Sequence, residues 1–355
     1  MPTLFDPIRL GDLDLPNRVI MAPLTRMRAA PDSRSPTFLT EQHYVQRASA
    51  GLILAEATSV DPMGVGYPNT PGVWTAEQTE GWRRVTAAVH AAGGRIALQL
   101  WHVGRLSEPL VLDGRTPISS SAIACDGYIS HRRPKRPFPV PRALETDEIP
   151  GVVEGYRRAA ENAQAAGFDG VEIHGANGYL LDQFLQDGCN KRTDIYGGAV
   201  ENRARLHLEV TDACISVWGA DRVGMHLAPR GDAQSMGDSN PPETFGYLAR
   251  ELGRRKLAYL FLREYVAPDR LAPAIRAAFG GPVIVNEQYT VEQAQADLDA
   301  GIADAVAFGR AFIANPDLPE RLRLNAPLNP LNAETIYTPG PKGYIDYPTL
   351  REVMV

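Results

Sequence analysis

The chain has 355 residues, a formal net charge of −6 at pH 7, and 44% hydrophobic residues. This length and composition suit either one large barrel or two ordinary domains. Because the net charge is negative and no long run of Lys or Arg occurs, the chain is not expected to bind nucleic acid or an anionic membrane surface. A small-molecule substrate is favoured instead.

The sequence also gives no sign of a metal site or of secretion. Cys125, Cys189 and Cys214 are isolated and form no C-x-x-C pair, which disfavours an iron–sulfur cluster, a zinc ribbon and a disulfide framework. The N-terminal stretch is acidic, with no apolar run of signal-peptide length, and no segment approaches the length of a membrane span. We therefore expect a cytoplasmic protein with reduced thiols, no metal and no membrane contact.

Short apolar runs rich in branched residues alternate along the chain with longer amphipathic segments. The runs predict eight strands, at residues 19–22, 52–57, 96–101, 171–174, 223–227, 259–262, 283–286 and 305–308. The amphipathic segments predict helices at residues 38–50, 76–92, 147–166, 201–218, 243–252, 270–278, 291–300 and 316–324. Eight alternations favour a closed parallel (β/α)8 TIM barrel with the helices outside, so we expect residues 1–355 to form a single α/β domain.

Two segments fall outside this alternation. Residues 103–145 are rich in Pro, Ser, Arg and His and are far longer than a usual strand-to-helix loop, so we expect a cap over the barrel mouth after the third strand. The Pro-rich tail, about residues 326–355, is expected to wrap onto the same domain. No Gly-x-Gly-x-x-Gly follows the first strand, which makes an open dinucleotide-binding sheet less favoured.

The stretch from Gly170 to Gly198 carries the clearest chemical signal. It runs from a buried strand into a polar cluster of His174, Asn177 and Tyr179. Two hydrogen-bond donors aimed at one point can polarise a carbonyl, and a nearby phenol can deliver a proton. A lone histidine at a strand end is often only a satisfied core residue, but the two neighbours favour a catalytic interpretation.

The other strand ends support the same interpretation, since active sites of such barrels lie at the carboxyl ends of their strands. The groups there are mostly aromatic, amide and hydroxyl, which suits a flat, hydrogen-bonding cofactor better than a hydrolytic carboxylate pair. Gly309 and Arg310 follow the eighth strand, where barrels commonly bind phosphate through backbone amides. The arginine adds a bidentate phosphate partner.

Taken together, these features resemble the Old Yellow Enzyme family of FMN-dependent ene-reductases. The resemblance covers nearly the whole chain, and several long motifs in the right order make it specific. Its motifs are LPNRVIMAPLTR (15–26), YVQRASAGLILAEAT (44–58), LQLWHVGR (98–105), the stretch 174–198, FGRAFIANPDLPERL and GYIDYPTL (343–350).

The resemblance implies FMN as cofactor, NADPH or NADH as reductant, and an activated alkene as substrate. Hydride from FMN N5 would add to the β-carbon, while His174 and Asn177 bind the carbonyl oxygen and Tyr179 protonates the α-carbon. The implied cofactor-binding residues are Pro23, Leu24, Thr25, Ala57, Gln99, His226, Glu287, Gln288, Gly309 and Arg310. The implied substrate-binding residues are Tyr67, Trp101, His174, Asn177 and Tyr337.

The chain departs from the family pattern at two cofactor positions. Where members usually carry an arginine at flavin N1 and O2, this chain has His226, so we expect a lower flavin potential or looser FMN. Where many relatives have a glycine in the phosphate loop after the seventh strand, this chain has Glu287, whose carboxylate is expected to turn outward from the phosphate.

We expect an NAD(P)H-dependent ene-reductase that acts as a monomer or homodimer, and two other functions are alternatives to it. A barrel aldolase is disfavoured because Schiff-base chemistry needs a lysine at a strand end, and the four lysines fall in predicted loops or helices. A flavin-binding barrel with weak or no turnover stays open, because His226 replaces the usual arginine.

Overall fold

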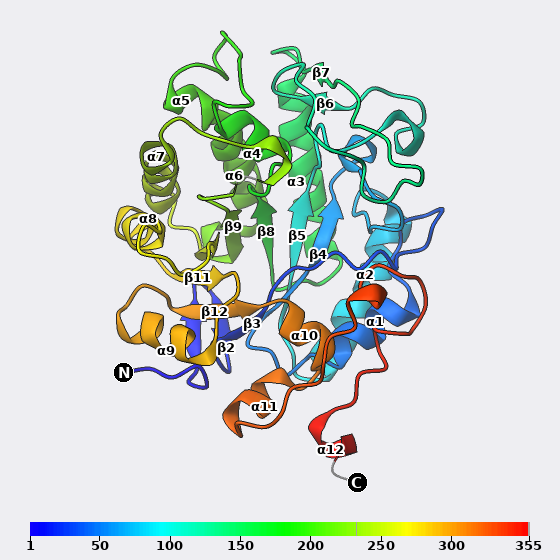
Figure 1. The fold of residues 1–355 in the computed structure, drawn as a ribbon, viewed down its shortest axis with the longest axis vertical. Helices are drawn as coiled ribbons and strands as arrows, with labels where there is room; N and C mark the ends of the chain where they lie inside the picture. Colours follow the sequence, from blue (N-terminus) through cyan, green and yellow to red (C-terminus); the bar gives the residue numbers. More distant parts are fainter. Residues whose placement is uncertain (232, 354–355) are drawn as a thin grey trace.

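The predicted (β/α)8 TIM barrel is confirmed by the computed structural model, which describes residues 1–231 and 233–353 (Figure 1). Eight parallel strands close in the order β3, β4, β5, β8, β9, β10, β11, β12. They are β3 (Val19–Met21), β4 (Ile53–Ser59), β5 (Ile96–Trp101), β8 (Gly170–His174), β9 (Val223–Leu227), β10 (Tyr259–Arg263), β11 (Val283–Asn286) and β12 (Ala305–Phe308). Nearly every residue of these strands is buried, as expected where helices cover the outside and side chains fill the inside.

The helices that cover the barrel lie where the sequence predicts them, with different ends. They are α1 (Phe38–Val45), α2 (Ala76–Ala91), α3 (Ile149–Ala165), α6 (Arg205–Trp218), α7 (Pro241–Arg254), α8 (Ala272–Phe279), α9 (Val291–Asp299) and α11 (Leu318–Arg323). Short helices α4 (Leu180–Leu185), α5 (Val200–Arg203), α10 (Arg310–Ala314) and α12 (Leu350–Val353) add to these. The first helix stops at Val45, earlier than predicted. Asn17 binds the Ser49 carbonyl there and turns the chain toward β4.

A hairpin that the sequence analysis missed closes the amino-terminal end of the barrel. It consists of β1 (Ile8–Leu10) and β2 (Leu13–Leu15), joined at Gly11 and Asp12. Its leucines pack against interior residues of the barrel strands, and the amide of Asp12 donates to the carbonyl of Asp221 at 2.9 Å. The alternation in IRLGDLDL around a Gly-Asp turn is a hairpin signal that could have predicted it.

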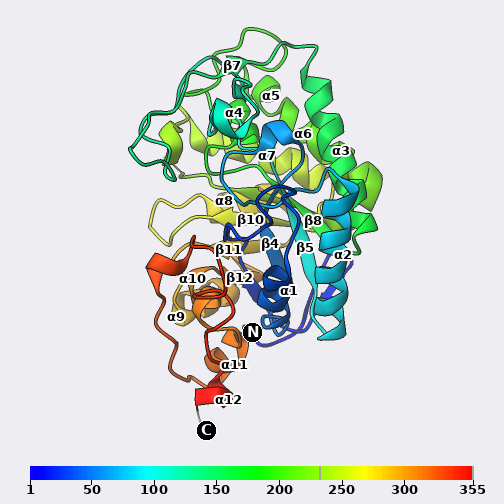
Figure 2. The same ribbon diagram turned by 90° about the vertical axis from the view of Figure 1, so that its right-hand side faces the viewer.

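The segment after β5 lies across the upper end of the molecule in both views, near α4 and α5 (Figures 1 and 2). It contains the short strands β6 (Ile118–Ser119) and β7 (Arg142–Ala143) and the 3-10 turn η2 (Pro109–Val111). Buried Arg105 ties its start to the carbonyls of Ile123, Gln234 and Ser235. The segment is therefore anchored to the loop after β9 as well as to its own strand.

Arginines near β3 and α1 hold the C-terminal tail against the barrel. Arg26 donates to the carbonyl of Gly343, and its guanidinium lies 4.9 Å from the centre of the buried Tyr344 ring. Arg28 donates to four carbonyls of the same tail, and the ring of His43 stacks on Tyr344 at 4.0 Å. No helix among the described residues has the length and apolar character that crossing a bilayer requires.

Candidate active site

His174, Asn177 and Tyr179 occupy the turn that leads from the end of β8 into α4. Gly175 permits a close approach there, because a Cβ at this position would lie 2.8 Å from His207 Nε2 and from Met225 Sδ. The chain then reverses through two residues in the left-handed region, Asn177 at φ 57° and Gly178 at φ 76°. This turn brings all three candidate side chains to the carboxyl end of the barrel.

The protonation state of His174 is set by burial and by the main chain. The Ala176 amide donates to His174 Nδ1 at 3.3 Å, so the neutral ring carries its proton on Nε2. Burial, assisted by the neighbouring His226 ring and the Arg263 cation, holds the pKa of His174 well below its usual range. His174 therefore offers a neutral N–H donor across the physiological pH range.

Aromatic rings pack around Tyr179 and fix its direction. Trp101 and His174 each meet the Tyr179 ring edge to face, with centroid distances of 4.9 and 5.0 Å. The hydroxyls of Tyr67 and Tyr179 lie 3.3 Å apart, and the Tyr67 ring stacks on Trp101. Burial raises the pKa of Tyr179 well above 10, so its hydroxyl stays protonated at neutral pH.

His226 lies directly beside His174, with parallel rings whose centroids are 5.1 Å apart. The two hydrogens of the Gln99 amide are used by Glu172 Oε1 at 2.7 Å and His226 Nδ1 at 3.0 Å, so His226 carries its proton on Nε2. That Nε2 is buried and has no hydrogen-bond partner among the described residues. Burial and the Arg263 cation lower the pKa of His226 to about 3, so the ring is neutral.

The first two barrel strands bring their predicted cofactor residues to the same mouth. The β4 ladder shifts register between Ala55 and Thr58, and this bulge frees the backbone around Ala57 from regular pairing. Pro23, Leu24 and Thr25 follow β3 and are partly buried. These three partly buried side chains and the irregularly paired backbone around Ala57 can line one side of a flat ring.

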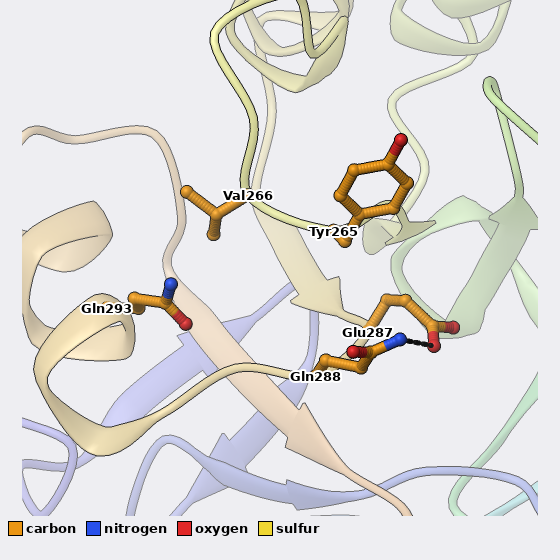
Figure 3. Close-up of a pocket in the computed structure, with 5 residues that line it drawn as sticks. All are labelled: Tyr265, Val266, Glu287, Gln288 and Gln293. Carbon is orange, nitrogen blue, oxygen red and sulfur yellow. Dashed lines mark hydrogen bonds between the residues drawn. The ribbon is translucent and has the colours of Figure 1, made fainter.

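The backbone is unusual just after the end of β11. Glu287 has φ 106° and Gln288 has φ 57°, conformations that glycine adopts without strain. The Glu287 carboxylate turns toward β10 and pairs with Arg263. Glu287 also lines a hollow of about 360 Å³, together with Tyr265, Val266, Gln288 and Gln293 (Figure 3). Gly309 and Arg310 follow β12, and the Arg310 side chain is exposed.

Arg263 is a site residue that sequence reasoning missed. Its side chain donates to Asn177 Oδ1 at 2.8 Å and to the Glu287 carboxylate. Its positive charge also helps to lower the pKa of His174 and of His226. An arginine at the end of a predicted strand is ordinarily read as a solvated residue, and its two partners are 86 and 24 residues away in sequence. Only the barrel brings them together.

The predicted substrate residues differ in their surroundings. Tyr67, Trp101 and His174 pack together around Tyr179, and Asn177 binds Arg263. Tyr337 is 59% exposed and makes no stacking contact in the described part of the chain. Tyr337 still lies close enough to add to the effect of burial in raising the pKa of Tyr67 and Tyr179. It therefore stands at the rim of the mouth, on the C-terminal tail.

The residues present fit an FMN ring and its phosphate. Within residues 1–231 and 233–353 the buried N–H of His226 has no acceptor, and flavin N1 or O2 could provide one. The Ala57 bulge offers backbone groups to the ring edge. The left-handed backbone at Glu287 and Gln288 lies at the end of the strand next to Gly309 and Arg310, where a phosphate could bind backbone amides.

Comparison with known proteins identifies relatives along almost the whole chain. Residues 3–329 match the model of the NADH:flavin oxidoreductase / NADH oxidase family. The chain is 43% identical to 12-oxophytodienoate reductase 1 of Oryza sativa subsp. japonica, over 99% of this chain and 94% of that protein. It is also 43% identical to flavin oxidoreductase hxnT of Emericella nidulans, over 97% of each.

Solved structures give the same result. Morphinone reductase, in a complex with tetrahydroNAD, is 52% identical and superposes with a TM-score of 0.95, covering 99% of this chain and 98% of that one. The Old Yellow Enzyme homologue from Zymomonas mobilis is 48% identical, also with a TM-score of 0.95, covering 98% of this chain and 100% of that one.

Stability should depend on pH through Glu172. Burial raises the pKa of Glu172 to about 8 from an ordinary value of 4.5, so between these pH values the folded state holds a proton that the unfolded state releases. The stability this proton confers is complete below pH 4.5 and is lost as the pH rises through 8.

Glu172→Gln should therefore gain stability relative to wild type from pH 5 to pH 9, by at least about 1.4 kcal/mol, the equivalent of one pH unit. Urea unfolding at fixed FMN measures this, with the exposed Glu334→Gln as control. Parallel profiles for Glu172→Gln and wild type would contradict it.

Glu287→Gly should stabilise the fold. A glutamate at φ 106° carries strain of about 2 kcal/mol, the middle of the usual range for such backbone. Glycine removes this strain but loses roughly 0.7 kcal/mol to a more flexible unfolded chain and about 0.5 kcal/mol from a partly exposed ion pair. We expect a net gain of about 1 kcal/mol in urea unfolding. Gln288→Gly removes a residue with an ordinary left-handed φ and should therefore gain less stability than Glu287→Gly. An equal gain in the two variants, or a larger gain in Gln288→Gly, would show that the Glu287 backbone is not strained.

Proposed function

Since this chain belongs to the NADH:flavin oxidoreductase / NADH oxidase family, with the Old Yellow Enzymes among its homologues, we propose that it is an ene-reductase that uses NAD(P)H to reduce C=C bonds activated by a carbonyl or nitro group. It is a flavin oxidoreductase, with FMN as cofactor and a nicotinamide as reductant. The observation that carries the proposal is the pair of neutral donors, His174 and Asn177, beside the protonated Tyr179.

The two donors bind the carbonyl oxygen of the substrate. His174 donates from Nε2, because Nδ1 accepts the Ala176 amide. Asn177 donates from its NH2 group, because Arg263 binds the carboxamide oxygen. As electrons move toward the substrate oxygen, negative charge collects where donors are already fixed, and the alkene becomes a better hydride acceptor at its β-carbon.

Tyr179 supplies the proton. Its hydroxyl stays protonated because burial raises its pKa, and the edge-to-face contacts with Trp101 and His174 hold it over the mouth. The phenol gives its proton to the α-carbon, and the neighbouring Tyr67 hydroxyl at 3.3 Å is placed to stabilise the resulting phenolate. A proton from this side and a hydride from the opposite side give net trans addition.

FMN, when bound, supplies hydride to the β-carbon from N5. Pro23, Leu24, Thr25, Ala57, Gln99 and His226 would hold its ring, and Glu287, Gln288, Gly309 and Arg310 its phosphate. The substrate pocket would be bounded by Tyr67, Trp101 and, at the rim, Tyr337. Because Gln99 and His226 share a hydrogen bond, the donor that His226 offers the ring is held in one tautomer.

A flavin-binding barrel with weak turnover is the second candidate, and the neutral state of His226 favours it. A pKa of about 3 means that this ring brings no positive charge to the cofactor at neutral pH, unlike an arginine. Such a protein would be yellow but would stay oxidised in the presence of NADH or NADPH. An ene-reductase would bleach and would regain its colour with an enone.

The substitution Tyr179→Phe tests the proposed proton donor. In wild type, anaerobic NADPH or NADH should bleach the flavin, and 2-cyclohexenone should restore the oxidised spectrum. In Tyr179→Phe, enone reduction should slow by about 10²–10⁴-fold, the usual contribution of a positioned general acid, while bleaching by the nicotinamide persists. Stopped-flow absorbance measures both steps.

Tyr128→Phe, at an exposed tyrosine of the cap segment, is the control. A wild type that never bleaches would exclude the function, and an unchanged enone step in Tyr179→Phe would exclude the role.

His226→Arg should raise the reduction potential of the flavin. A permanent cation replaces a neutral donor where the reduced ring gathers negative charge, so the reduced form gains stability. The expected shift is on the order of 30 mV upward, which for a two-electron couple corresponds to about 1.4 kcal/mol. Spectral titration against a dye of known potential measures it, with His226→Gln as the neutral control. A potential that does not rise in His226→Arg would count against the cofactor role of this position.

A further inference from the structure

Arg263 extends a charged side chain from the end of β10 to Asn177 and Glu287, in the loops after β8 and β11. Phe261, two residues earlier, packs inside the barrel against His226 at 4.3 Å, so Arg263 leaves the strand on the same side. Its guanidinium then spans the space between β8 and β11. Nη1 donates to Asn177 Oδ1 at 2.8 Å, and Nε faces the Glu287 carboxylate.

The contact with Arg263 decides which end of the Asn177 carboxamide is free. A guanidinium has donors only, so the atom it binds must be the amide oxygen, and the NH2 group is left to point elsewhere. Without this partner the amide could rotate about its terminal torsion and present its oxygen to a carbonyl substrate, which would be repulsive. A fixed donor is worth more to catalysis than one that must first be oriented.

Glu287 in turn holds Arg263. The arginine side chain is 41% exposed and, without an anchor, could sample many rotamers, whereas the carboxylate engages its Nε and leaves Nη1 for Asn177. The two partners therefore fix the guanidinium from opposite sides. Glu287 and Asn177 come from loops after different strands, so the arrangement exists only in the closed barrel.

We propose that Arg263, anchored by Glu287, is a positioning residue that locks the Asn177 carboxamide with its NH2 group toward the substrate carbonyl. The proposal rests on the proposed role of Asn177 and adds a residue to which sequence reasoning gave no role. Burial is the largest cause of the lowered pKa of His174 and His226 and keeps both rings neutral without Arg263. Arg263 therefore acts through Asn177, and its removal should matter only while Asn177 is present.

A double-mutant cycle on the FMN-loaded protein tests this dependence. We expect Arg263→Leu to lower kcat/KM for 2-cyclohexenone about 10-fold and to weaken inhibition by cyclohexanone, which binds through its carbonyl without reacting. Asn177→Ala should lower kcat/KM at least as much, and the double variant should be no worse than Asn177→Ala alone. Arg263→Lys should restore part of the loss, and Glu287→Gln should reproduce part of it. Arg255→Leu, which removes an ion pair with Asp212 on the outer helices, should leave the rate unchanged.

The side-chain amide resonance of Asn177, assigned by its loss in Asn177→Ala, gives a readout that does not need turnover. Arg263→Leu should shift or broaden this resonance, and Arg255→Leu should not. If wild type fails to reduce the enone, the proposed function fails, while the resonance still reports on the contact. An unshifted resonance in Arg263→Leu, or single-variant losses in kcat/KM that multiply in the double variant, would overturn the positioning role.

Discussion

Desolvation of the barrel mouth is the constraint on which the proposed chemistry depends. Burial is the largest cause of the shifted pKa values of His174, His226, Tyr179 and Glu172, and in each case it favours the neutral form. Two imidazoles thereby become N–H donors with a defined tautomer, and a phenol keeps its proton. The site can then stabilise charge that develops on a substrate, because its own groups carry little of it.

Arg263 is the cation that enters this neutral environment, and its partners show why that can be tolerated. Glu287 balances its charge, and Asn177 accepts its hydrogen bond. His226, Arg263 and Glu287 stand at or just beyond the ends of three successive strands, β9, β10 and β11. On this side of the mouth β10 therefore contributes a positive charge that is paired with an acid, while the imidazole on β9 is neutral.

The sequence predicted the eight barrel strands to within two residues at each end, because each is a short buried run whose neighbours are amphipathic helices. His174, Asn177 and Tyr179 could be grouped because one strand end carries all three. The hairpin under the barrel could have been predicted from the alternation around Gly11 and Asp12, whereas its packing against the barrel interior could not, because those contacts are long-range. Arg263 could not be found from local pattern, since its role depends on a contact across the barrel with Asn177.

At Glu287 the energy of the backbone strain can be compared with the energy of the ion pair, and the comparison shows whether stability explains a glutamate at this position. Its backbone at φ 106° costs about 1–3 kcal/mol, whereas an ion pair with side chains 41% and 24% exposed returns at most about 1 kcal/mol. Stability alone would therefore favour glycine at this position. Compared with glycine, glutamate at this position loses stability and provides a carboxylate that binds Arg263. A left-handed loop suits a phosphate, and the carboxylate holds the arginine that orients Asn177.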